Sequence, residues 1–191
     1  MSAHFNVNET GFFSLEHWPV TVCAWRGCCI EVFARAEHSV ADCLRALEMA
    51  GVAVGKDAHS PFAATRLKSL STSIKRHDFG GHGKAALDRI ESWERVYEAR
   101  ACLAHGRIKA TPSGIAIIPV AFGGKAEGPA PPRQISKLDM LKLLAEIERA
   151  QIGLHNQLGQ IKALAPSAAP LPKQADPGSP ACAGAGKSGV T

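Results

Sequence analysis

Two side chains that could act together on a phosphate group stand near the end of one stretch, residues 87–106 (LDRIESWERVYEARACLAHG). Histidine is the usual general acid or base near neutral pH, so His105 is suited to transfer a proton. Arg100 stays charged and presents a planar fork of donors that matches phosphate oxygens. The pair predicts phosphodiester chemistry in which the histidine moves protons and the arginine stabilises developing charge, without a metal ion.

The helix that must position this pair is predicted to span residues 84–105. Gly106 follows directly, and a glycine there is typical of a helix end in the left-handed conformation. Five residues turn an ideal helix by about 140°, so a long arginine side chain, a distorted last turn or a second subunit must bring the pair together. The expected apolar stripe of the helix consists of Leu87, Ile90, Trp93, Tyr97, Ala101 and Ala104.

The segment RACLAHG, residues 100–106, resembles the signature of the HEPN family (higher eukaryotes and prokaryotes nucleotide-binding domains), often written RNxxAHG. In that family the Arg and the His lie near the end of the third helix of a small bundle. The resemblance implies a metal-independent endoribonuclease that acts as a dimer, with the motifs of two subunits in one cleft. Many such proteins are toxins or phage-defence effectors, which adds an antitoxin protein as a potential partner. The chain has Ala101 where the family usually has Asn or another polar residue, so a non-catalytic HEPN-like interaction module is the alternative.

The composition is that of one globular domain with tails. The 191 residues are 46% hydrophobic but only 6% aromatic, which favours a helical core rich in Leu, Ile, Val and Ala. The net charge of +5 favours a polyanionic partner such as RNA. The six cysteines form no CxxC pair, no basic-then-apolar leader opens the chain, and charges interrupt every apolar run of membrane length. We therefore expect a cytoplasmic, reduced protein without a membrane partner or a cofactor.

The predicted fold class is all-α: an antiparallel four-helix HEPN-like bundle with a β-hairpin inserted between helices 3 and 4. The hairpin is predicted from the alternation after Gly106 and from the turn residues 111–114, and Pro119 makes its second strand an edge or a short one. A Ser136–Asp139 capping box opens the last helix. The predicted helices cover residues 19–50, 61–76, 84–105 and 136–164; the domain spans 16–165, between an irregular arm (1–15) and a disordered Ala/Pro/Gly-rich tail (166–191).

Glu37 is the charged member of the apolar stripe of the first helix, which otherwise holds Ile30, Phe33, Val40, Leu44 and Leu47. A carboxylate there must reach the surface or find a partner. One reading is a rim glutamate that bends outward; the other is that Glu37 faces Arg100 or His105 and orients it. A purely structural alternative pairs Arg100 with Glu37 or Glu94 and leaves His105 to cap the last carbonyls.

Other polar groups suggest contacts rather than catalysis. Cations on the second helix and on the hairpin would follow a phosphate backbone, although such a run is often only a solvated face. The loop with His77, Asp78 and His82 invites a metal interpretation, but lacks a second ligand cluster, so we predict a turn and no metal site. The segment ACAGAGKS near the end lacks the strand and helix that a phosphate-binding loop requires. The predicted RNA-binding residues are Arg66, Lys75, Arg76, Arg107 and Lys109.

Overall fold

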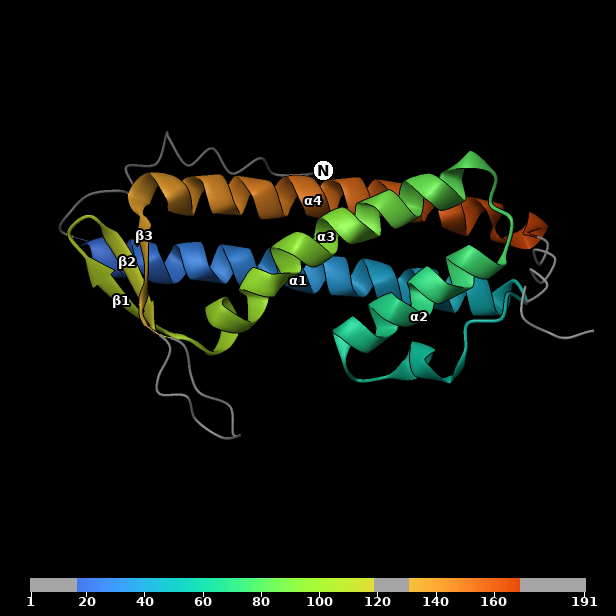
Figure 1. The fold of residues 1–191 in the computed structure, drawn as a ribbon, viewed down its shortest axis with the longest axis horizontal. Helices are drawn as coiled ribbons and strands as arrows, with labels where there is room; N and C mark the ends of the chain where they lie inside the picture. Colours follow the sequence, from blue (N-terminus) through green and yellow to red (C-terminus); the bar gives the residue numbers. More distant parts are fainter. Residues whose placement is uncertain (1–16, 119–130, 169–191) are drawn as a thin grey trace, which may run out of the picture.

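Four helices and a three-stranded antiparallel sheet make up the described part of the chain, residues 17–118 and 131–168 of a computed structural model (Figure 1). No helix in these two ranges combines the length and the apolar character needed to cross a membrane. The helices are α1 (Trp18–Met49), α2 (Ala63–Arg76), α3 (Gly81–His105) and α4 (Lys137–Leu164). The strands are β1 (Arg107–Thr111), β2 (Gly114–Ile118) and β3 (Arg133–Ser136), and two short 3-10 helices are η2 (Lys56–His59) and η3 (Ala165–Ser167).

The helical fold class, with strands between the third and fourth helices, is confirmed. Helix α3 begins three residues before its predicted start, because Gly80 adopts φ 57° and turns the chain into the helix. Ser136 caps α4 as predicted, since its side chain accepts a hydrogen bond from the Asp139 amide. The short helix η3 extends the ordered fold slightly into the segment that was predicted to be a disordered tail.

The third strand is the element that the sequence did not predict. β3 ends at Ser136, the predicted first residue of the last helix, and pairs with β2, with Ile115 opposite Ile135. β2 is therefore the central strand, so the edge-strand alternative is wrong, whereas the alternative of a short strand agrees with its described end at Ile118. Gly114 sits where β3 approaches closely: a Cβ there would overlap the carbonyl oxygen of Ile135. Four residues are too few to show a clear alternation before their pairing partner is known.

The helices do not simply alternate in direction. Three contacts between α1 and α4 follow the same order along both helices, so these two run parallel: Trp25 with Met140, Ser39 with His155 and Cys43 with Leu158. α3 is antiparallel to α1, because Arg26 meets Leu103 whereas Phe33 meets Trp93. Figure 1 shows the reason: the connection after α1 returns along that helix before α2 begins.

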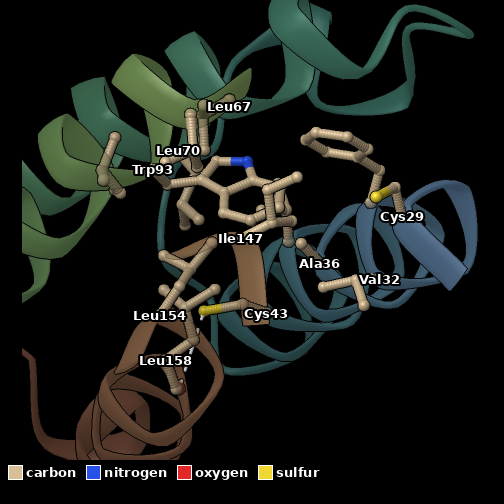
Figure 2. Packing of buried hydrophobic residues seen from close by; sticks show 14 of the residues in the cluster. Cys29, Val32, Ala36, Cys43, Leu67, Leu70, Trp93, Ile147, Leu154 and Leu158 are labelled. Atoms are coloured by element: carbon tan, nitrogen blue, oxygen red, sulfur yellow. Dashed lines mark hydrogen bonds between the residues drawn. The ribbon is translucent and has the colours of Figure 1, made fainter. Parts of the chain in front are cut away.

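The core lies where all four helices meet around Trp93, which is 2% exposed (Figure 2). Leu67 and Leu70 from α2, Ile147 and Leu154 from α4, and Val32, Ala36 and Cys43 from α1 belong to this cluster. Three- and four-residue steps in the sequence of α4 predict one buried stripe, and all six of its residues are buried: Met140, Leu144, Ile147, Leu154, Leu158 and Ile161. This agreement follows from the regular spacing of apolar residues over a long helix.

Two predicted core positions are wrong. A helix that starts at residue 61 would place Phe62 on the buried face with Leu67 and Leu70, but Phe62 is 71% exposed because it precedes the first residue of α2. Ala101 is also exposed, and Leu103 is buried in the last part of α3 instead. The buried side of α3 therefore shifts toward its end, where the helix leaves the four-helix core and meets the sheet (Figure 1).

Candidate functional site

Arg100 is held by Glu37. The Arg100 Nε lies 2.6 Å from the Glu37 Oε1, and the two side chains are 34% and 19% exposed. Of the two expectations for Glu37, the structure confirms that the carboxylate faces Arg100. The contact is made by Nε, at one edge of the guanidinium, and the two Nη nitrogens form another edge. That edge is the part of a guanidinium that binds phosphate oxygens in pairs.

Tyr97 connects this ion pair to the core. Its hydroxyl donates a hydrogen bond to the Glu37 Oε1 at 3.2 Å, and the Arg100 guanidinium lies 5.6 Å from its ring centroid. The ring packs edge-on against Phe33 at 5.9 Å, and Phe33 packs against Trp93 at 5.5 Å. Such aromatic contacts fix ring orientation. The position of Glu37, and through it Arg100, is therefore tied to the bundle core.

The Tyr97 phenol is itself perturbed. Burial raises the pKa of Tyr97 above its ordinary value, and the neighbouring Glu37 carboxylate raises it further. The positive charges of Arg100 and Arg66 act in the opposite direction. The phenol thus stays protonated near neutral pH and serves as a hydrogen-bond donor to Glu37.

His105 is exposed on the last turn of α3, and Arg26 of α1 holds that turn. The Arg26 Nε donates to the carbonyl oxygen of Leu103 at 2.6 Å, and its Nη2 donates to that of Ala104 at 2.8 Å. The last carbonyls of a helix lack partners within it, so a cation that binds two of them both caps the turn and complements the helix dipole. Arg26 was not predicted to belong to the site, because its position on a partly apolar helix stretch gives no sign of this distant contact.

Gly106 does not adopt the left-handed conformation that the sequence suggested. Its φ and ψ are −65° and 146°, which is extended backbone, and its amide donates to the Cys102 carbonyl at 2.8 Å. Glycine is required there for another reason. A Cβ would overlap the Cys102 carbonyl oxygen and lie 3.0 Å from the Cγ2 of Ile117 in β2. The turn after His105 is therefore closed by direct packing of the backbone against the sheet.

Arg100 and His105 are held at separate places along α1. Arg100 is anchored at Glu37, whereas the turn that carries His105 is anchored at Arg26. Eleven residues separate these two anchors, which corresponds to about 16 Å on a straight helix. Two different side chains of α1 therefore hold Arg100 and the last turn of α3.

The five predicted RNA-binding cations do not form one patch. Arg107 and Lys109 are exposed on β1, directly after His105. Lys75 and Arg76 are exposed in the last turn of α2. The end of α2 and strand β1 lie at opposite ends of the molecule (Figure 1). The structure therefore groups two of these cations with His105 and separates two others from it.

Arg66, the fifth cation, is half-buried and lines a groove between α1 and the segment that leads into α2. Its Nη1 donates to the Ser60 carbonyl at 2.7 Å. Its Nε is buried without a hydrogen-bond partner among the described residues. Glu37 lines the same groove, so Arg66 belongs to the surroundings of the Glu37–Arg100 pair.

The histidines beside Asp78 make separate contacts. The His77 Nδ1 is 3.0 Å from the Ser73 carbonyl, and Asp78 accepts a hydrogen bond from the Gly80 amide at 2.7 Å. His82 contacts Gln157 of α4. Across residues 17–118 and 131–168, no three His, Cys, Asp or Glu side chains are grouped so that they could hold a metal ion. His77 and Asp78 thus lie in the connection between α2 and α3, and His82 lies in the first turn of α3.

The predicted irregular arm, the possible extension of the second hairpin strand to residue 122, and the ACAGAGKS segment lie outside the described residues. Comparisons of the chain with protein-family models, with curated proteins and with solved structures found no match. The interpretation of the site therefore rests on its own residues and their geometry.

Proposed function

We propose that the protein is a metal-independent endoribonuclease of the HEPN type, with Arg100 and His105 as its catalytic residues. The observation that carries the proposal is an exposed imidazole fixed at the end of α3 together with an oriented guanidinium on the same helix. The order of the elements, with strands directly after the His-Gly pair, agrees with the family that the RACLAHG segment resembles.

The chemistry follows from the two side chains. Cleavage of RNA without a metal requires removal of the 2′-hydroxyl proton, stabilisation of the charged phosphorane and protonation of the leaving oxygen. His105 moves a proton. Arg100 offers its Nη edge to the phosphate oxygens while Glu37 holds its Nε. Glu37 is thus a positioning residue, and it lowers the net charge beside the arginine.

We further propose that two copies of the chain complete the site. One histidine cannot act as acid and base at the same moment, and different residues of α1, Glu37 and Arg26, hold Arg100 and the turn that carries His105. A two-fold arrangement would bring the Arg100 of one copy toward the His105 of the other. The exposed Arg107 and Lys109 beside His105 would contribute positive charge to such a cleft.

The test is cleavage of single-stranded RNA in the presence of a metal chelator. We expect the wild-type protein to cleave, and His105→Ala and Arg100→Ala each to lower the rate by about a hundredfold or more. His82→Ala is the matched control, because it removes an exposed imidazole from the opposite end of the same helix. Equal cleavage by the wild type, His105→Ala and His82→Ala would refute the proposal. Mixing the two inactive variants and measuring recovered cleavage tests the shared site.

The second candidate is a non-catalytic interaction module, and the Glu37–Arg100 ion pair favours it. A half-buried pair with a tyrosine hydrogen bond stabilises a bundle whether or not the site is active. Under this function, no chelator-resistant cleavage is seen, and Arg100→Ala lowers the melting temperature or weakens self-association. An active nuclease whose His105→Ala variant keeps its melting temperature would exclude the module.

A further inference from the structure

The groove that Arg66 lines adjoins the Glu37–Arg100 pair, and the catalytic proposal leaves its interior without a role. It has a volume of about 520 Å³ and lies between one face of α1 and residues 58–66. Ala34 and Ala41 contribute small side chains to the α1 wall, which leaves space between that helix and the opposite segment. The volume is in the range of sites for small molecules, and is far too small for a nucleic-acid duplex.

The charges at one end of the groove favour an anion. Two carboxylates line the groove, and each has a cationic partner: Glu37 pairs with Arg100 and accepts a hydrogen bond from Tyr97, and Asp42 pairs with Arg45 at 3.1 Å. Arg66 lies close enough for its charge to act on the Tyr97 phenol. Only the Nη1 of Arg66 has a hydrogen-bond partner within the described residues, the Ser60 carbonyl. A guanidinium carries five N–H donors, so several remain for the oxygens of a ligand.

The walls of the groove carry groups that suit unpaired bases. His38 and His59 both line it, and both are exposed. His59 lies 3.1 Å from the Glu48 Oε1, which orients its ring. Unstacked bases of single-stranded RNA pack on histidine rings and guanidinium planes, whereas duplex RNA is recognised across its grooves by shape. The Arg66 cation at one end of the groove thus suits a phosphate, and the histidine rings along its walls suit the bases of the attached nucleosides.

We infer that this groove binds nucleotides of single-stranded RNA, with Arg66 on a phosphate and the two histidines on bases. The inference rests on the proposed function, because the RNA strand that is cleaved at Arg100 would continue along α1 into the groove. It also specifies the substrate class: the enzyme acts on unpaired RNA, since a duplex cannot enter the groove.

The experiment measures RNA binding without cleavage. In the His105→Ala background, we compare the affinity for a short single-stranded RNA of mixed sequence with that for the duplex of the same sequence. We expect preference for the single strand, and about a tenfold loss of affinity on Arg66→Gln, as for one charge-assisted hydrogen bond. Lys68→Gln is the matched control, because it removes a charge from the same helix but from a different groove.

A second readout does not depend on the fold of the Arg66 variant. The ring resonances of His38 and His59 should shift when single-stranded RNA is added, and His59→Ala should weaken binding severalfold. Equal affinity for duplex and single strand, or equal losses on Arg66→Gln and Lys68→Gln, would overturn the inference. If the wild type fails to cleave RNA but binding still depends on Arg66, only the nuclease proposal fails.

Discussion

The two halves of α3 are held in place by different kinds of contact. In the first half, Ile90 and Trp93 are 2% exposed and pack among apolar side chains of the other helices. In the second half, Arg100 is fixed by an ion pair, and the last turn is fixed by hydrogen bonds from Arg26. One half stabilises the bundle, and the other presents polar groups at fixed positions.

The difference shows how a bundle can expose a reactive group without loosening the helix that carries it. Apolar packing stabilises in proportion to buried area but does not set the direction of a polar side chain. Hydrogen bonds to charged groups are directional and act at the edge of the core. Tyr97 joins the two halves, because its ring contacts Phe33 and its hydroxyl contacts Glu37.

The largest expected change in the free energy of unfolding tests the first half of α3, which apolar contacts hold. Trp93→Ala removes a large buried side chain that contacts Phe33, and should lower the free energy of unfolding by about 3–5 kcal/mol. Denaturant titration followed by circular dichroism measures the change. Glu94→Ala, at an exposed neighbouring position, should change it by less than about 0.5 kcal/mol. Similar losses for both variants would contradict a core centred on Trp93.

The second prediction concerns the same core and is a change in the free energy of unfolding with pH. Burial raises the pKa of Cys29 and that of Cys43 from 9.0 to about 12. The unfolded chain therefore loses these thiol protons at lower pH than the folded protein does. The free energy of unfolding should be unaffected below pH 9 and should fall between pH 9 and 12, by about 1 kcal/mol per thiol near pH 10.

Denaturant titrations with a reducing agent at neutral and alkaline pH measure this fall in the free energy of unfolding. Cys43→Ala should make the loss between neutral and alkaline pH smaller, whereas Cys23→Ala should leave it unchanged, because Cys23 is exposed and lies outside the core. An identical alkaline loss in the wild type and in Cys43→Ala would show that the buried thiols are not its source.

The smallest expected change in the free energy of unfolding tests the second half of α3, which polar contacts hold. Arg26→Ala removes both hydrogen bonds to the last turn of α3 and should lower the free energy of unfolding by about 1–2 kcal/mol. The change should be local: amides near the end of α3 should exchange faster, while those around Trp93 keep their protection. Hydrogen exchange measures both regions. Arg35→Ala, which removes an exposed arginine from the same helix, serves as the control. Uniform loss of protection along α3 would mean that its two halves are not held independently.

The candidate site was only partly predictable. The types and spacing of Arg100 and His105 are visible in the sequence, and so is the anomaly of Glu37 on an apolar stripe. The sequence left open whether Glu37 bends outward or pairs, and contacts between α1 and α3 decided this. Arg26 was missed, because its partners are backbone carbonyls 77 and 78 positions away, and these leave no side-chain signature.

The sequence by itself determined the helices, the buried face of α4 and the Ser136 cap, because these depend on residues within a few positions of one another. The tertiary structure decided the third strand, the parallel course of α1 and α4, and the separation of the predicted cations between two ends of the molecule. It also showed that Gly106 is needed for close packing against Ile117 rather than for its φ. These features depend on segments that meet only after folding, which periodicity along the chain does not encode.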